Sequence, residues 1–305
     1  MAGAILLLFV LMQFVPGDLI SIMLGPRVTP ELRQAFTERM GLDRPIPERL
    51  WLFFSNAVRG DFGTDVVSHR PIIDIVLEVL PNTLQLAFAA MVIGASLGVA
   101  LGCIAALRPG SRLDTFLGIA SVAFITTPSF VVAIFLLLIF SLALHWLPVT
   151  GAGDPASLSD RLAHLILPAS ALAIGWIGYV ARLVRASLLE VLSEQHIRMM
   201  RAYGVPERRI VGRYALKLAL VPLVAVLGLG IGDLISTSVF AEIIFARPGI
   251  GSLVYNSIMS RNYPLAQAGF LVFVLVYVIS GLVVDIINSL LDPRIARSLK
   301  LRGAT

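Results

Sequence analysis

The sequence is poor in charged residues, cysteine and histidine. Only 14% of its 305 residues are charged, whereas a soluble globular domain carries about 25%, so there is too little charge to cover a soluble surface of this size. The single cysteine, Cys103, excludes an intrachain disulfide and a zinc site built from cysteines. The four histidines are scattered singly, with no spacing that indicates a metal site: His69, His145, His164 and His196.

A phosphate-binding loop is also lacking. No GxxxxGK[ST] pattern occurs in the sequence, so any ATP that this protein uses must be hydrolysed by another polypeptide. No convergent acids, nucleophile–base pair or metal ligands are readable, which argues against a membrane enzyme. Gly228, Gly230 and Gly232 are not a dinucleotide fingerprint, because no strand or acidic follower accompanies them. Small residues in this pattern instead allow helices to pack closely.

Apolar residues dominate the chain. They make up 57% of it, the mean hydropathy is +0.89, and the least costly arrangement presents this apolar excess to lipid. The formal net charge of +5 could indicate nucleic acid as a partner. The basic residues, however, lie between apolar runs rather than in one basic domain, which is how membrane topology is encoded. The sequence therefore predicts a multi-pass membrane protein that contacts lipid and binds no nucleic acid.

Six charge-poor runs are long enough to consider as membrane spans, since a crossing helix needs about 20 mostly apolar residues. They predict an all-α membrane protein with six transmembrane helices, at residues 1–15, 80–107, 115–147, 162–181, 214–245 and 264–284. The fifth run carries Asp233 in its middle and Glu242 near its outer end. A charge in mid-membrane is costly, so Asp233 is expected either to face a pathway or partner subunit or to have a structural partner. For Glu242 a structural contact with the PGIG turn at 248–251 is favoured over contact with substrate.

The first run is short for a span. About 15 residues at 1.5 Å each cover about 22 Å, whereas the hydrocarbon core is about 30 Å thick. A cleaved signal peptide is one interpretation, but there is no basic n-region and no small-x-small cleavage pattern before residues 16–18. We favour a transmembrane helix over residues 1–16 whose first turns are missing.

The basic residues also predict orientation. Three alternate segments, around Arg108, between Arg182 and Lys217, and from Arg294 onward, hold most of the 24 basic residues and few acids. Such segments lie in the cytoplasm, so both termini are expected there. The expected organisation is an extracytoplasmic segment at 17–78 with helical character at 29–40, a permease domain at 79–292 and a cytoplasmic tail at 293–305.

The segment between the fourth and fifth runs, residues 185–213, is unlike an ordinary short loop. Leu188, Leu189 and Leu192 repeat at helical spacing, so the fourth helix is expected to extend into the cytoplasm. Gly204 permits a positive φ and Pro206 forbids a continuing helix, so the chain must turn there. The residues alone predict a basic helix–turn–helix at the bilayer, and leave open whether it is an interfacial anchor or a docking surface.

Short motifs follow one another in order along almost the whole chain. They are PGD at 16–18, GDFG at 60–63, LPNT at 80–83, WLP at 146–148, LP at 167–168, EIIF at 242–245, RPGIG at 247–251 and LDPR at 291–294. Each string alone is weak, but their joint order resembles the permease subunits of binding-protein-dependent ABC importers, specifically the oligopeptide/dipeptide/nickel permease family. The resemblance implies a type I ABC importer permease fold that transports peptides or a related small solute.

In that family a cytoplasmic loop, named for a Glu-Ala-Ala triplet, inserts into a groove of the ATPase subunit. Gly204 matches its glycine, and Arg198-Met199-Met200 stands where the triplet would be, although the triplet itself is absent. The resemblance therefore assigns ATPase coupling to Glu190, Arg198, Met199, Met200, Arg201, Ala202, Tyr203, Gly204, Val205 and Pro206. Candidates for the translocation path or for helix packing are Asp233, Glu242, Pro128 and Asn82.

The resemblance also implies the partners. They are a second homologous permease, two ATP-binding subunits, and a periplasmic or lipid-anchored solute-binding protein. The chain itself binds no cofactor, and ATP and Mg²⁺ belong to the partner subunits. Nickel, glycosides and opines are alternative cargoes of the same family. A stand-alone secondary transporter is a more distant alternative, because the two halves show no internal repeat.

Overall fold

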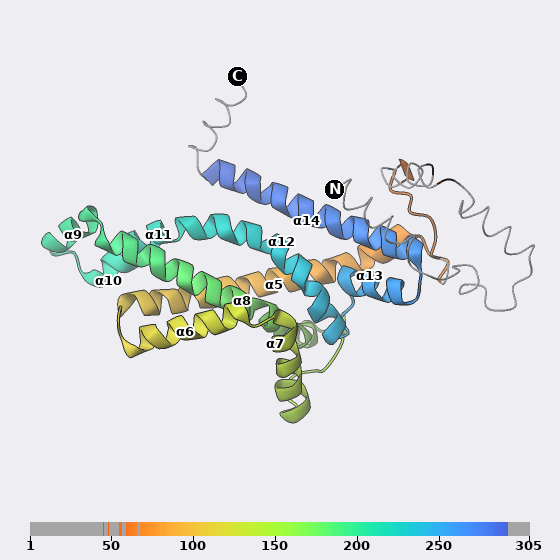
Figure 1. Cartoon of the computed structure of the whole chain (residues 1–305), viewed down its shortest axis with the longest axis horizontal. Coiled ribbons are helices and arrows are strands. Elements are labelled where there is room, and N and C mark those ends of the chain that lie inside the picture. Colours follow the sequence, from red (N-terminus) through yellow and green to blue (C-terminus); the bar gives the residue numbers. More distant parts are fainter. Residues whose placement is uncertain (1–44, 46–47, 49–54, 57–58, 66–67, 292–305) are drawn as a thin grey trace, which may run out of the picture. The chain divides into compact units, whose positions relative to one another are not determined.

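The computed structural model describes residues 45, 48, 55–56, 59–65 and 68–291 (Figure 1). The expected first span, the helix expected at 29–40 and the tail at 293–305 lie outside these residues. In the described part the regular structure is helical, apart from an isolated antiparallel bridge between Thr64 and Pro71. Its elements are α5 (Ile72–Leu107), α6 (Arg112–Thr126), α7 (Ser129–Leu136), the π-helix η1 (Leu137–Ala143), α8 (Leu158–Ser193), α9 (Gln195–Ala202), α10 (Glu207–Arg209), the π-helix η2 (Ile210–Ala215), α11 (Leu216–Ala219), α12 (Val221–Ile244), α13 (Ile250–Met259) and α14 (Tyr263–Leu291).

Within the described residues, four single helices are long and apolar enough to cross a membrane: Ile72–Leu107, Leu158–Ser193, Val221–Ile244 and Tyr263–Val284. A fifth span results if the bent pair Arg112–Thr126 and Ser129–Ala143 is counted as one. The run expected at 115–147 is thus not a continuous helix, because its two parts meet at 102°. Pro128 accounts for the break: it has no N–H for the helical ladder, and it holds Thr127 in an extended conformation.

The chain divides into two compact units, and the helices α5 and α14 each contribute residues to both. The first contains the described residues up to Pro81 together with Pro248–Val276. Its apolar core is formed by α5, α13 and α14, through Ile72, Val76, Ile250, Leu265, Ala268 and Val272. In the same unit, Asp65 is only 4% exposed and accepts hydrogen bonds from Ser68 and from the Asn262 side chain. These bonds hold the segment before α5 against the start of α14.

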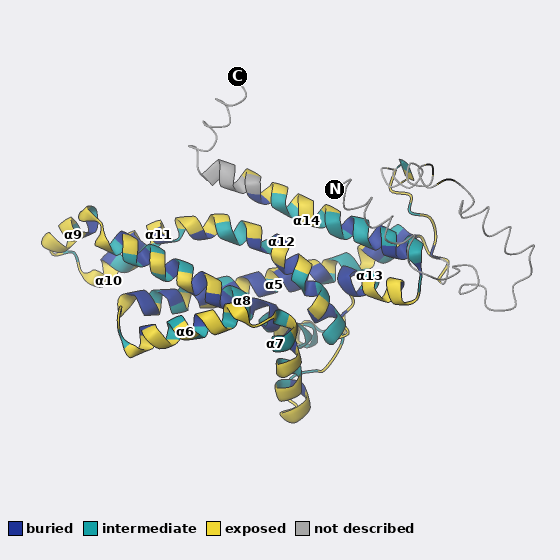
Figure 2. Cartoon of the chain, in the orientation of Figure 1, coloured by how far each residue is buried: buried dark blue, intermediate teal, exposed yellow. Residues whose placement is uncertain are grey.

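The second unit, Asn82–Arg247 and the chain from Tyr277 onward, contains all of α8, whose buried residues are dark blue in Figure 2. Close packing of α5 on α8 depends on three glycines spaced four residues apart: Gly94, Gly98 and Gly102. A Cβ at Gly98 would lie 2.6 Å from the Cβ of Val180, and one at Gly102 would lie 2.6 Å from the carbonyl oxygen of Ala181. The backbones of the two helices approach each other because these positions carry no side chain.

We therefore expect Gly98→Ala to destabilise the protein, even though alanine is the better helix former. The added methyl would meet Val180 at 2.6 Å, and such overpacking costs about 1–3 kcal/mol. Gly118→Ala is the matched control, because Gly118 is also helical but has nothing within 4 Å of its Cβ position. Thermal unfolding of the purified protein in detergent should show a lower midpoint for Gly98→Ala only. Equal midpoints for the two variants would contradict this packing.

The glycines of α12 serve the same purpose on two faces. Gly228 and Gly232 face α14, where a Cβ would meet Val284 at 2.2 Å and Tyr277 at 3.0 Å respectively. Gly230 lies on another face, and a Cβ there would be 2.4 Å from the ring of Trp176 in α8. The expectation that these glycines allow close helix packing is confirmed, and Gly230 in particular makes room for the Trp176 indole.

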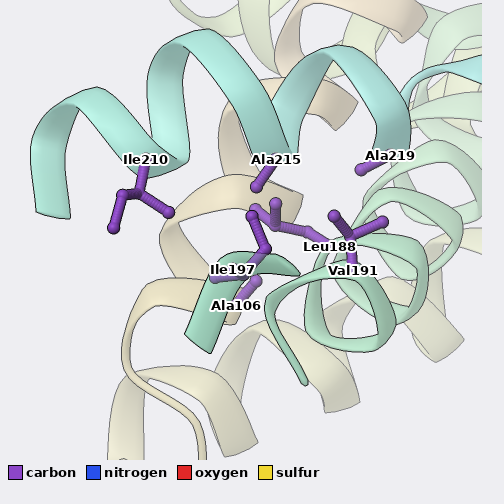
Figure 3. Packing of buried hydrophobic residues seen from close by; sticks show 7 residues of the cluster. All are labelled: Ala106, Leu188, Val191, Ile197, Ile210, Ala215 and Ala219. Atoms are coloured by element: carbon purple, nitrogen blue, oxygen red, sulfur yellow. The ribbon is translucent and has the colours of Figure 1, made fainter. Parts of the chain in front are cut away.

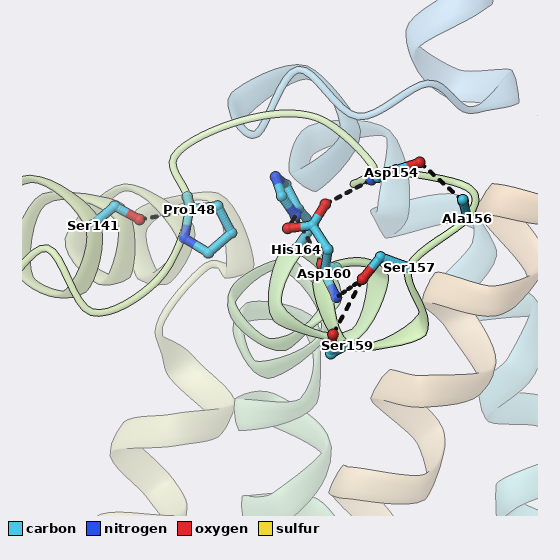
Figure 4. Close-up of polar contacts among 8 residues, drawn as sticks. All are labelled: Ser141, Pro148, Asp154, Ala156, Ser157, Ser159, Asp160 and His164. Carbon is cyan, nitrogen blue, oxygen red and sulfur yellow. Dashed lines mark hydrogen bonds and ion pairs between the residues drawn. The ribbon is translucent and has the colours of Figure 1, made fainter.

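The connection between η1 and α8 is held by local hydrogen bonds (Figure 4). Ser157 caps α8 by accepting from the Asp160 N–H, and the Asp160 carboxylate accepts from the Asp154 N–H at 2.6 Å. His164 contacts Asp160 one turn into the helix. The Gly151 N–H donates to the carbonyl of Phe245 at the end of α12. This connection therefore fixes the amino-terminal end of α8 against the carboxyl-terminal end of α12.

Candidate functional site: the turn beyond α8 and a membrane cavity

Helix α8 continues unbroken to Ser193, twelve residues beyond the apolar run that ended at Ala181. The predicted extension of this helix is confirmed. The chain then forms α9, turns at Gly204, whose φ is +75°, and resumes in α10 with Pro206 as the N-cap. Figure 1 shows α9 and α10 at the far end of α8. We call residues 198–206 the knob.

The knob is attached to the bundle by a small apolar core (Figure 3). Ile197 of α9 and Ile210 of η2 are completely buried there. The core joins α5, α8, α9, η2 and α11 through Ala106, Leu188, Val191, Ile197, Ile210, Ala215 and Ala219. Because side chains from five elements pack in this one core, the segment that carries the knob is closely joined to α8.

The residues assigned to coupling divide into two groups. Met200 and Val205 pack against the apolar core. The others are exposed, with Tyr203 at 81% and Met199 at 54%; the rest of this exposed group is Glu190, Arg198, Arg201, Ala202, Gly204 and Pro206. A large exposed tyrosine and methionine beside an open glycine form the kind of surface that a protein partner covers.

An ion pair that was not predicted from the sequence joins α9 to α10 across the turn of the knob. The Arg201 guanidinium donates to both carboxylate oxygens of Glu207, at 2.7 and 3.1 Å, and to the carbonyl of Leu192. The pKa of Glu207 is lowered and that of Arg201 raised, each chiefly by this hydrogen bond. A carboxyl group whose pKa is lower in the folded than in the unfolded protein stabilises the fold at pH values above its unfolded pKa. The stabilising contribution of Glu207 is therefore present at neutral pH and is lost as pH falls through the lowered pKa.

A second ion pair joins the α5–α6 turn to α8. Arg185 donates to the two oxygens of Asp114 at 2.5 and 2.7 Å, and Asp114 also accepts from the Gly110 N–H at 2.9 Å. Asp114 is only 6% exposed. The Ser-x-x-Asp pattern of Ser111 and Asp114 indicates a helix start, but nothing in the sequence identifies a partner 71 residues away.

Two of the residues proposed for the path or for packing, Pro128 and Asp233, line a common cavity of about 360 Å³. Its walls are the α6–α7 bend, α8 and α12. Asp233 is exposed toward it, and the indole N–H of Trp176 donates to Asp233 Oδ2 at 3.3 Å. Sequence reasoning identified the charge but not the indole, because Trp176 lies in an apolar stretch of α8 and nothing in the sequence pairs it with Asp233.

The other two, Asn82 and Glu242, lie elsewhere. Glu242 is completely buried, and its Oε1 accepts from Thr83 Oγ1 at 2.7 Å and from Ser238 Oγ at 3.3 Å. Asn82 is the half-buried neighbour of Thr83. These contacts connect the amino-terminal part of α5 to the carboxyl-terminal end of α12. The sequence predicted a contact of Glu242 with the PGIG turn at 248–251 but did not indicate Thr83; next to that turn, the Arg247 N–H donates to the Glu242 carbonyl at 2.8 Å.

The fold matches that of known transporter chains. A chain of the inward-facing MetNI methionine ABC transporter superposes with a TM-score of 0.59 at 19% identity, covering 72% of this chain and 96% of the other. An amino acid ABC transporter crystallised with histidines gives 0.55 at 18% identity, covering 72% and 94%. The fold is therefore that of the membrane-spanning subunits of ABC transporters.

Residues 98–297 match the family described as the binding-protein-dependent transport system inner membrane component, and this chain belongs to that family. A glutathione transport system permease protein, GsiC, of Shigella flexneri is 36% identical over 292 residues, covering 95% of this chain and 92% of the relative. The di/tripeptide transport system permease protein DppB of Pseudomonas aeruginosa is 34% identical over 315 residues, covering 96% and 94%.

The family membership confirms the resemblance noted in the sequence. The chain is a multi-pass inner membrane protein and the permease subunit of an ABC transporter, and catalysis is not a function of this family's membrane component. Dependence on a binding protein implies a solute-binding partner and an ATPase partner.

Proposed function

We propose that this permease imports small peptides, either di- and tripeptides or glutathione. The observation that carries this proposal is the 34–36% identity, over almost the full length of both chains, to permeases of glutathione and di/tripeptide systems. Nickel, glycoside or opine transport is the alternative within the same family.

Transport by the assembled complex tests the cargo. The chain, its second permease, its ATPases and its binding protein are reconstituted into vesicles, and uptake of labelled Ala-Ala, glutathione and Ni²⁺ is followed with and without ATP. We expect ATP-dependent uptake of at least one of the two peptides and none of Ni²⁺. Uptake of Ni²⁺ but of neither peptide would show that the cargo is Ni²⁺ instead. Nucleotide-independent uptake by this chain alone would reject the importer mechanism.

In this proposal the chain crosses the membrane six times, with both termini in the cytoplasm, and pairs with a second, homologous permease. The extracytoplasmic segment at 17–78 faces a periplasmic or lipid-anchored binding protein. The apolar spans and the clustering of basic residues in alternate connections support this topology.

The knob is the contact for the ATPase. Its exposed residues, Tyr203 above all, would be covered by the ATPase, and the buried Ile197 that precedes it would pass the resulting displacement to α8. A positive-φ glycine at the tip permits a compact turn with no side chain between the two surfaces. Asp233 and Pro128, which line one cavity, belong to the translocation path, whereas Glu242 and Asn82 serve helix packing.

A further inference from the structure

The cavity between the α6–α7 bend, α8 and α12 is unusual for an apolar bundle. Besides apolar side chains it is lined by Thr127, Ser129 and Thr237, by the ring of Tyr179, and by Asp233. Among the described residues that line it, Asp233 is the one charged side chain. A carboxylate in a membrane-spanning helix is costly, so a functional role is the first hypothesis for Asp233.

Three features favour a positive charge in this cavity. The first is the Asp233 carboxylate itself, and the second is the pair of aromatic residues beside it. Trp176 and Tyr179 both line the cavity, and their rings are arranged edge to face, with centroids 5.7 Å apart at 69°. Aromatic faces attract cations, most strongly where water is excluded. Trp176 is held in place, because Gly230 makes room for its ring and Gly94 for its Cβ.

The third contribution comes from the end of α6. The helix stops at Thr126, and its carboxyl-terminal end, which carries a partial negative charge, faces the bend at Thr127 and Pro128 that lines the cavity. The carbonyl oxygen of Phe124 lies 3.7 Å from the Cβ position of Gly175, another lining residue. Pro128, four residues after Phe124, has no N–H to donate to that carbonyl.

We propose that this cavity binds an ammonium group of the transported solute, with Asp233 as the counter-charge and Trp176 and Tyr179 as the aromatic wall. The inference rests on the proposed function and adds a substrate class to it: small peptides with a free α-ammonium group, which Ala-Ala and glutathione share. The volume of about 360 Å³ falls at the small end of ligand pockets, about 300–1,000 Å³, and suits a peptide of two or three residues.

Equilibrium binding to the assembled permease–ATPase complex, purified without the binding protein, tests the proposal. Labelled Ala-Ala is displaced by unlabelled Ala-Ala, by glutathione or by N-acetyl-Ala-Ala, which lacks the ammonium group. We expect the acetylated peptide to bind at least fivefold more weakly than Ala-Ala. If unlabelled glutathione displaces labelled Ala-Ala as well as unlabelled Ala-Ala does, the site recognises the ammonium group alone; if it displaces the label less well, the rest of the cavity selects between the two peptides.

Two variants assign the effect to the carboxylate. Asp233→Asn keeps the shape and removes the charge, and should reduce the preference for the free ammonium group to less than twofold. Asp233→Glu should retain part of that preference. Asp74→Asn makes the same change at an exposed helical acid that does not line the cavity and should leave the preference intact. Gel filtration of each complex verifies assembly.

Equal binding of the free and acetylated peptides to the wild-type complex would overturn the ammonium site, as would a complete absence of peptide binding. So would an unchanged preference in Asp233→Asn. Vesicle uptake by the complete wild-type transporter separates this failure from failure of the proposed function. Continued uptake of peptide together with equal binding refutes only the site, whereas absence of peptide and glutathione uptake refutes the function itself.

Discussion

Gly204→Glu is expected to leave membrane insertion intact and to lower coupled uptake at least tenfold, which corresponds to about 1.4 kcal/mol of lost coupling. The glycine adopts a φ of +75°, where a residue with a Cβ is strained by about 1–2 kcal/mol. Its Cβ position has nothing within 4 Å, so the new side chain would point outward, into the surface assigned to the ATPase. Uptake and copurification of the ATPase are the measurements.

Gly110→Glu is the control for the backbone strain and for the added glutamate side chain. Gly110 has a φ of +74° and an equally open Cβ position, but it lies in the α5–α6 turn. Gly204→Asn separates strain from surface, because asparagine tolerates a positive φ and should retain more transport than the glutamate variant. Normal transport by Gly204→Glu, or an equal loss in Gly110→Glu, would remove the coupling role from the knob.

Arg185→Ala is expected to destabilise the protein and to lower the midpoint of thermal unfolding, since it removes both hydrogen bonds of a bidentate partner from the Asp114 carboxylate. Asp114 is 6% exposed and would keep its hydrogen bond from Gly110 but lose both from Arg185. Arg185→Lys should recover only part of the loss, because lysine cannot reproduce the planar bidentate contact. Thermal unfolding in detergent, converted to free energy where it is reversible, is the measurement.

Arg182→Ala is the control for this ion pair. Arg182 is exposed on the same helix, three residues earlier, and its removal should change the stability by less than about 0.5 kcal/mol. The double variant Asp114→Ala/Arg185→Ala should be less destabilised than the sum of the two single changes, because neither charge is then left alone. If the destabilisation of the double variant equals the sum of the two single changes, the interaction between Asp114 and Arg185 contributes nothing to the stability.

Some features of the candidate site were predictable because they depend on residues close in the chain. The leucines at 188–192 repeat at helical spacing, and α8 does run on to Ser193. Gly204 and Pro206 indicated a turn, and the turn is there. The apolar run at 115–147 predicted one continuous span, and this was wrong. Hydropathy shows how long an apolar run is, but not whether the helix changes direction within it. Pro128 bends it by 102°.

Contacts between distant segments were not predictable in the same way. Asp114 and Arg185 are 71 residues apart, and Thr83 and Glu242 are 159 apart. A single sequence shows which of these residues are charged, but not which of them meet. The indole beside Asp233 was hidden for the same reason, since Trp176 reads as one more apolar residue of a long helix.

The amino-acid sequence by itself determined that this protein resides in a membrane, that several of its apolar runs are long enough to cross it and where its basic hairpin turns, because lipid solvation and glycine or proline geometry act on neighbouring residues. Its ordered motifs also determined the permease family. Only the tertiary structure decided that Pro128, Trp176 and Asp233 enclose one cavity and that Arg185 holds the α5–α6 turn. Those relations arise from helices that approach closely at glycines, and helix packing brings together residues that the chain keeps far apart.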